Sequence, residues 1–154
     1  MNKAEFVSMS LPYNLWAFDT VSQKSYPIRF DKGCPECVCK ILGFEKYKDM
    51  CLNVFQAAND EMIKPILRPL SDLNKEIEHN GDKFIPIEEL GYNKEYDVTF
   101  YTDGAYFAIY RNGIHCVCAQ GKMLSKLIEW HFDVADLISK GQAIDLNQSV
   151  NPYK

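Results

Sequence analysis

The cysteines carry the clearest chemical pattern in this sequence, because the stretch CPECVC at 34–39 begins with a metal-binding spacing. Two residues separate Cys34 from Cys37, which is the spacing that lets a tight turn present two thiolates to one zinc ion. A structural zinc site needs two more ligands, and Cys116 and Cys118 on one predicted strand can supply them. Cysteine is also a common small core residue, so both pairs are compatible with reduced thiols on strands. The sequence leaves both interpretations open.

A catalytic cysteine or histidine would need a converging set of groups, which the sequence does not assemble. The histidines are His79, His115 and His131, and nothing places one of them beside a reactive thiol. His131 lies between Glu129 and Asp133, which suggests a general base. It also falls on the apolar stripe of a predicted helix, where a hydrogen-bonded core histidine is the more common explanation. We therefore name no catalytic residue.

Basic and aromatic residues are the candidates for ligand contact. Lys64 and Arg68 lie in IKPILRPL, where Arg68 can either hold an anion or pair with a carboxylate such as Asp72. The sequence contains no phosphate loop, no dinucleotide-binding glycine pattern and no H-E-x-x-H zinc motif. A nucleotide pocket requires an aromatic face beside a cation. We predict ligand contacts from Lys64, Arg68, Tyr106, Tyr110 and Arg111.

The N-terminal half is rich in predicted strands. Residues 13–30 carry β-forming patches around a polar middle and predict a hairpin, and residues 37–55 predict two further strands. Residues 63–70 contain two prolines, which disfavour a helix interior or a central strand. We therefore expect an extended segment at a sheet edge there.

The C-terminal half combines tight turns with one helix. Asn80-Gly81 predicts a hairpin over 76–86, followed by one helical turn after Pro86. Residues 96–118 predict three antiparallel strands, whose middle strand presents tyrosines on one face. Apolar residues then recur at helical spacing from 124 to 138, and AIDL at 143–146 predicts a last short strand.

This order predicts an α+β fold, in which antiparallel strands (the N-terminal hairpins and the 96–118 meander) pack with a C-terminal helix. A length of 154 residues fits a single domain over 1–154. Within it we expect a strand-rich part at about 10–70 and a meander-plus-helix part at about 71–147.

Charge and hydropathy exclude several classes of protein. The formal charge of -4 gives no basic face for duplex nucleic acid. No apolar run reaches the roughly 18–20 residues that span a bilayer, and the first residues do not form a signal peptide. We therefore expect a cytoplasmic protein with reduced cysteines and no membrane partner.

Three blocks of the sequence resemble a family of small proteins encoded by phages and prophage-like elements of gut bacteria: IKPILRPLSDL (63–73), EIEHNGDKFIPIEEL (76–90) and LIEWHFDVADLISKGQAIDLN (127–147). The resemblance covers roughly the C-terminal half, with a looser similarity at LPYNLW (11–16). It transfers no catalytic or binding residue. It implies a stoichiometric binder that interferes with host machinery or host defence.

The sequence and the resemblance together predict a non-enzymatic, phage-type accessory protein. We expect it to bind a host factor or a small anionic or nucleotide ligand, without a cofactor. The alternative is a zinc-stabilised module that binds nucleic acid or protein through the Cys34–Cys37 knuckle. An uncovered sheet edge would also allow a homo-oligomer.

Overall fold

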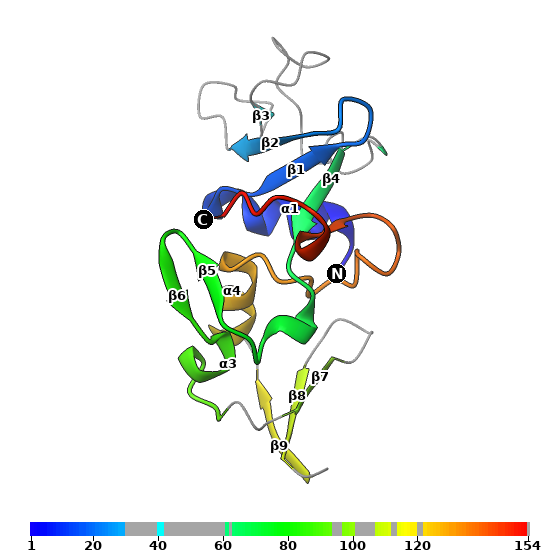
Figure 1. The fold of residues 1–154 in the computed structure, drawn as a ribbon. Coiled ribbons are helices and arrows are strands. Elements are labelled where there is room, and N and C mark those ends of the chain that lie inside the picture. The colour runs from blue at the N-terminus through cyan, green and yellow to red at the C-terminus, as the bar shows by residue number, and fades with distance from the viewer. Residues whose placement is uncertain are drawn as a thin grey trace.

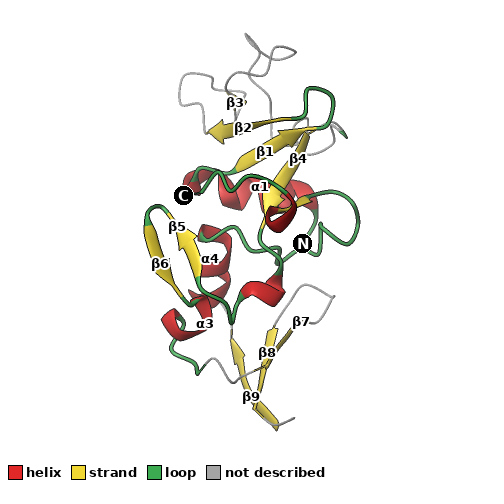
Figure 2. Cartoon of the chain, in the orientation of Figure 1, coloured by secondary structure: helices red, strands yellow, loops and turns green. Residues whose placement is uncertain are grey.

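A computed structural model shows an α+β fold in which helices pack with mostly antiparallel strands (Figures 1 and 2). The structure describes residues 1–29, 40–41, 61, 63–93, 97–100, 107–111, 114–119 and 122–153, and between 97 and 119 it describes the backbone. The helices and helical turns are α1 (Lys3–Ser10), η1 (Leu11–Tyr13), η3 (Leu70–Asp72), α3 (Pro86–Glu89), α4 (Lys122–Glu129) and η4 (Leu146–Gln148). The strands are β1 (Trp16–Asp19), β2 (Lys24–Arg29), β3 (Lys40–Ile41), β4 (Ile63–Leu67), β5 (Ile77–His79), β6 (Asp82–Phe84), β7 (Asp97–Phe100), β8 (Phe107–Arg111), β9 (Ile114–Ala119) and β10 (Ile144–Asp145).

The main sheet has the strand order β10-β4-β1-β2-β3. The β1–β2 hairpin confirms the prediction for 13–30, and β3 is the described part of the strands expected over 37–55. The edge position expected for 63–70 is wrong, because β4 pairs antiparallel with β1 and parallel with β10. Its proline is tolerated because β10 pairs only with Ile66 and Leu67, so Pro65 lies just before the part of β4 that is paired on both sides.

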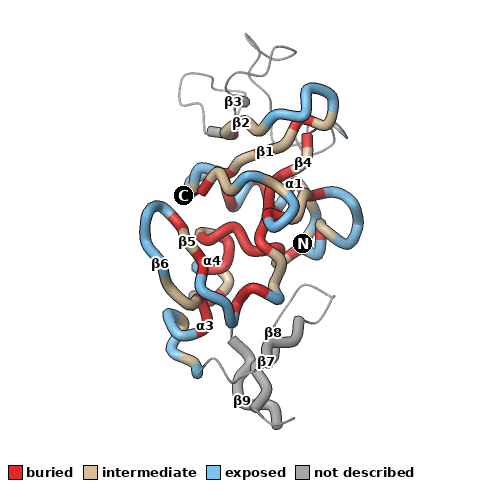
Figure 3. The backbone as a smooth tube through the Cα atoms, viewed as in Figure 1, coloured by how far each residue is buried: buried red, intermediate tan, exposed pale blue. Residues whose placement is uncertain are grey.

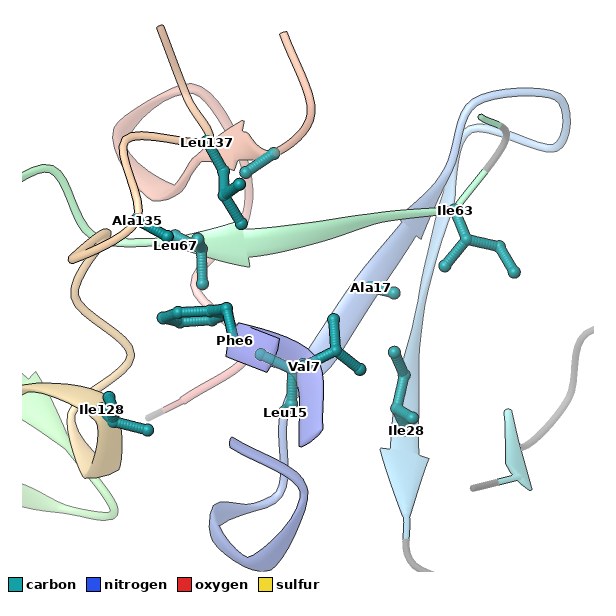
Figure 4. Packing of buried hydrophobic residues seen from close by; sticks show 11 residues of the cluster. Phe6, Val7, Leu15, Ala17, Ile28, Ile63, Leu67, Ile128, Ala135 and Leu137 are labelled. Carbon is teal, nitrogen blue, oxygen red and sulfur yellow. The ribbon is translucent and has the colours of Figure 1, made fainter. Parts of the chain in front are cut away.

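One face of this sheet packs against α1, a helix that the sequence analysis did not predict (Figure 4). The helix begins with reciprocal hydrogen bonds: Glu5 N donates to Asn2 Oδ1 (2.9 Å) and Asn2 N donates to Glu5 Oε2 (2.8 Å). Phe6 and Val7 then pack against residues that alternate along the strands. The buried residues of this first cluster are Phe6, Val7, Leu15, Ala17, Ile28, Ile63, Leu67, Ile128, Ala135, Leu137 and Ala143.

A second apolar cluster joins the β5–β6 hairpin, α3 and α4 (Figure 3). The hairpin and the helical turn that begins at Pro86 both confirm the sequence prediction. In the turn Asn80 and Gly81 have φ values of 53° and 88°, as a two-residue hairpin turn requires. The buried residues of this cluster are Leu73, Ile77, Ile87, Met123, Leu127, Trp130 and Phe132.

The C-terminal helix is shorter than its apolar spacing predicts. It ends at Glu129, and His131 has a left-handed φ of 61°. The following residues pair with β4 instead of continuing the helix, because Arg68 and Phe132 form a parallel bridge. The chain then forms turns and the short strand β10, which confirms the strand predicted at 143–146.

The meander predicted over 96–118 is confirmed, because β7, β8 and β9 pair in antiparallel order. The sheet lies at the end of the molecule away from β1 and β4 (Figure 1). Its register shifts between Ile109 and Tyr110, so Val117 pairs with Ile109 and His115 with Tyr110.

Within the described ranges no helix is long and apolar enough to cross a membrane.

Candidate functional site

The candidate site forms where the end of β4 meets the residues that follow α4. Arg68 N donates to the carbonyl of His131 (2.8 Å), and Asp133 N donates to the carbonyl of Arg68 (2.9 Å). These two bonds hold Phe132 alongside β4, with its side chain in the second apolar cluster. The backbone pairing thus holds His131 next to Arg68, although the two are far apart in sequence.

The guanidinium of Arg68 is buried, with 4% of the residue exposed. Its Nε donates to the carbonyl of Trp130 (3.2 Å) and its Nη2 to the carbonyl of Glu78 (2.6 Å). Burial lowers the pKa of Arg68, with opposing contributions from Tyr153 and Asp72, but an arginine stays protonated in a protein. The side chain therefore joins the residue that follows α4 to β5 while it carries a positive charge.

Arg68 has no ion-paired carboxylate among the described residues. The pairing with Asp72 that the sequence suggested is wrong, because Asp72 uses its carboxylate elsewhere. It accepts from Lys75 Nζ (2.5 Å) and from Asn147 Nδ2 (2.8 Å), and it acts on Arg68 only through the longer-range Coulomb attraction. A buried charge that has hydrogen-bond acceptors but no ion-paired carboxylate remains costly, so the site favours a counter-charge that the described part of the chain does not supply.

Two imidazoles lie beside this charge. The ring centroids of His79 and His131 are 5.5 Å apart, and both residues are buried. Neither ring nitrogen of His131 makes a hydrogen bond of good geometry, and Nδ1 of His79 also makes none. His131 is a buried core residue as predicted. The chain turns at this residue and directs the ring against other rings, so the hydrogen bond expected of a core histidine is reduced to a weak contact with the Tyr13 backbone.

The surroundings of both histidines favour the neutral imidazole. Burial, followed by the Coulomb repulsion of His79 and Arg68, lowers the pKa of His131 well below its ordinary value, while a weak hydrogen-bond contact with the Tyr13 backbone opposes this shift. Burial and Arg68 also lower the pKa of His79, against an opposing contribution from Glu129. An anion placed between these groups would have the opposite effect, because a nearby negative charge favours the protonated form.

Tyr153 covers the two histidines. Its ring stacks on His131 with a centroid separation of 4.1 Å and an interplanar angle of 11°. Its hydroxyl donates to the carbonyl of Ile66 (2.7 Å) and accepts from Trp16 N (3.2 Å). Burial raises the pKa of Tyr153, so the phenol remains protonated at neutral pH. We call Arg68, His79, His131 and Tyr153 the Arg68 cluster.

The cluster has the character of a binding site more than that of a catalytic one. A general base needs a group that orients it, and the neighbouring Asp133 is occupied. Its carboxylate accepts from Leu137 N and Ile138 N (both 2.8 Å), and burial raises its pKa. What the cluster offers is a buried guanidinium, two imidazoles and an aromatic ring, which suit a ligand with an anionic group.

The predicted contact residues lie in different parts of the fold. Arg68 belongs to the cluster, and Lys64 is half-buried on β4 in register with Phe18. Residues four apart in a strand share a face, so β4 places Lys64 and Arg68 on the same side. Tyr110 and Arg111 lie in β8, at the end of the molecule away from β4 (Figure 1), and Tyr106 lies outside the described residues.

The sequence analysis did not predict the pairing of His79 with His131 or the role of Tyr153. Each depends on contacts between distant parts of the chain: Trp16 and Tyr153, which hydrogen-bond, are separated by 137 positions. No local spacing reports such a contact. The one available signal was the presence of histidines in two of the three family-like blocks.

The zinc site remains a prediction. Cys34 and Cys37 lie outside the described residues, whereas Cys116 and Cys118 lie in β9. The register shift of β9 falls at Cys116, so the regular strand alternation that the prediction assumed is interrupted there. Among the residues that the structure describes, no group of three or more histidine, cysteine or acidic side chains could hold a metal ion.

No family model, no curated protein and no solved structure matches this chain, so its site is interpreted from its own geometry and the phage-type assignment remains a prediction.

Proposed function

We propose that this protein is a non-enzymatic accessory protein of the phage type that acts by binding a small anionic ligand or a host protein. Its setting in the host cytoplasm and a role against host defence belong to the same proposal. They rest on the resemblance of the three sequence blocks. The ligand branch rests on the Arg68 cluster.

The single observation that supports the ligand branch is the unbalanced charge of this cluster. Arg68 is buried with backbone carbonyls as its hydrogen-bond acceptors, and the adjacent imidazoles have unpartnered nitrogens. A phosphate-like group would give the guanidinium a bidentate partner and would accept hydrogen bonds from the imidazoles once they are protonated. The same anion would remove the cost of leaving these buried groups unpaired.

The direct test is calorimetric titration with inorganic phosphate and pyrophosphate at neutral pH. Arg68→Gln should weaken binding about tenfold or more, because it removes a charge-assisted bidentate contact. Lys83→Gln is the matched control, because it removes the same charge from an exposed position on β6. It should leave binding unchanged.

Arg68→Lys keeps the proposal testable if Arg68→Gln does not fold. It retains the charge and loses the planar fork, so we expect intermediate binding. Equal affinity in the wild type and in Arg68→Lys would contradict a site built on the guanidinium. A negative result across phosphate, pyrophosphate, and cyclic and linear di- and oligonucleotides would remove the ligand branch and leave a host protein as the partner.

A further inference from the structure

Tyr153 occupies a defined slot, which we call the Tyr153 slot. The floor of the slot is the imidazole of His131, and its end is formed by the Trp16 N–H and the Ile66 carbonyl. The guanidinium of Arg68 is in cation–π contact with the tyrosine ring that fills the slot, with Cζ 5.9 Å from the ring centre. The slot thus presents an aromatic face, one hydrogen-bond donor, one acceptor and a cation.

The segment that carries Tyr153 is anchored mainly at its two ends. At one end Asn147 donates to Asp72, and at the other Asn80 N donates to the carbonyl of Tyr153 (2.7 Å). Between these points the hydrogen bonds of Ser149 are local, and Val150 is 87% exposed. Tyr153 is therefore the residue through which the C-terminal segment closes the Arg68 cluster.

The closure leaves polar groups unpartnered beneath it. Both nitrogens of His131 are buried without a hydrogen bond of good geometry while the phenol ring covers the imidazole. An unsatisfied buried polar group lowers the stability of the arrangement that buries it. The phenol therefore fills the slot in shape and hydrogen-bonds with the groups at its end. Its ring lies in cation–π contact with Arg68, but it supplies neither a full negative charge for the guanidinium nor a hydrogen bond for the imidazole below.

We propose that the Tyr153 slot is the ring-binding half of the anion site, and that the ligand is an aromatic ring bearing an anionic group, such as a nucleotide, which enters by displacing Tyr153. This inference rests on the proposed binding of anions at Arg68. A nucleobase stacks on a planar side chain and presents donors and acceptors along its edge, as the slot requires. The attached phosphate would reach the guanidinium and the imidazoles, which the phenol does not neutralise.

Tyr153 then acts as a tethered competitor. Because the slot must open before the ligand binds, the observed affinity is reduced by the fraction of molecules in which Tyr153 occupies it. Removal of the tyrosine should therefore tighten the binding of a ligand that uses the slot. The same substitution should have a smaller effect on the binding of an ion that contacts Arg68 and does not enter the slot.

The test compares UMP with inorganic phosphate by calorimetry on the full chain and on Tyr153→Ala. Uracil carries N–H and carbonyl groups side by side, which suits the rim of the slot. We expect Tyr153→Ala to bind UMP about tenfold more tightly than the wild type and to change phosphate affinity by less than about threefold. Val150→Ala, an exposed change in the same segment, should match the wild type for both probes.

The outcomes separate the two proposals. If UMP binds no more tightly than phosphate to either protein, the slot inference is overturned while anion binding at Arg68 stands. If neither probe binds the wild type or Tyr153→Ala, both fail. Should Tyr153→Ala not fold, Tyr153→Phe weakens the closure by removing only the hydroxyl, and equal UMP affinity in Tyr153→Phe and the wild type would overturn the inference.

Discussion

His131 is a residue of the Arg68 cluster whose burial costs the fold stability. Its ring is wholly buried and its nitrogens make no hydrogen bond of good geometry, and a polar group left unpaired in this way costs about 1–3 kcal/mol. Its neighbours are a guanidinium, a second imidazole and a phenol, none of which carries a negative charge at neutral pH. The folded protein is therefore more stable with a neutral His131 ring than with a protonated one.

This preference for the neutral ring predicts the pH dependence of stability. Because the pKa of His131 is lowered in the fold, the unfolded chain takes up the proton first as the pH falls below about 6.5. The contribution of His131 to stability is thus complete above that pH and is lost as the pH decreases. We expect the free energy of unfolding, measured with urea between pH 8 and pH 5, to fall by up to about 1.4 kcal/mol per pH unit for each imidazole that remains neutral.

His131→Asn isolates this contribution, because asparagine tolerates the left-handed φ of 61° and does not titrate. The variant should show a shallower decline below pH 6.5, with the remaining slope assigned to His79. Asp133 has the opposite effect on stability. Burial raises its pKa, so its contribution to the free energy of unfolding is complete below about pH 3.8 and is lost as the pH rises through its pKa in the folded protein. A slope identical in the wild type and His131→Asn would show that His131 is accessible to protons in the fold.

The β5–β6 hairpin is the element that joins the cluster to the second apolar cluster. Its first strand contains His79, and it also contains Glu78, whose carbonyl accepts from Arg68. Its turn contains Asn80, whose N donates to the carbonyl of Tyr153. The geometry of the turn depends on two left-handed residues, Asn80 and Gly81. The hairpin is therefore both part of the scaffold and part of the site.

Gly81→Ala tests this dependence. A Cβ at Gly81 would have no other heavy atom within 4 Å, so the change adds no clash and reports only the cost of a left-handed backbone. We expect a loss of about 1–2 kcal/mol in the free energy of unfolding by urea denaturation. Asn80→Gly is the matched control and should change stability by less than about 0.5 kcal/mol, since glycine also adopts this conformation. Equal stabilities of the two variants would contradict the assigned turn.

The same hairpin shows which elements are predictable from sequence. Asn-Gly between apolar runs is a local signal, and so is the proline that opens α3, because each fixes backbone angles without help from distant residues. α1 was missed because Phe6 and Val7 are adjacent and give no clear helical stripe in so short a segment. β4 was misplaced because it pairs with two short strands, one of them from the far end of the chain, in spite of its proline.

The end of α4 and the Arg68 cluster could not be predicted for a related reason. Apolar spacing continues past Glu129, but the backbone bonds of His131 and Asp133 to Arg68 replace the next helical turn. These bonds are between residues more than sixty positions apart, so no window of the sequence contains both partners. The sequence indicated Arg68 as a candidate, whereas its neighbours come from the tertiary fold.

On the scale of the whole molecule, the described residues already form three apolar clusters around the main sheet and α4. The third is the smallest, with Ile66, Leu146 and Tyr153 buried on the sheet face away from α1. Ile128 of α4 belongs to the first cluster and Leu127 to the second, so one helix links the two. A chain of this length buries enough surface to fold without a metal or disulfide staple.

We therefore expect zinc to be dispensable for stability. Protein purified without added metal should contain less than about a tenth of an equivalent of zinc, and a chelator should leave its thermal unfolding temperature unchanged, because metal-dependent domains unfold when the ion is removed. Stoichiometric zinc together with a lower unfolding temperature after chelation would instead support the knuckle module. In that case Cys34→Ser and Cys116→Ser should each abolish zinc binding if the ligands are the predicted four. Loss in Cys34→Ser alone would locate the site at the first pair and require other ligands.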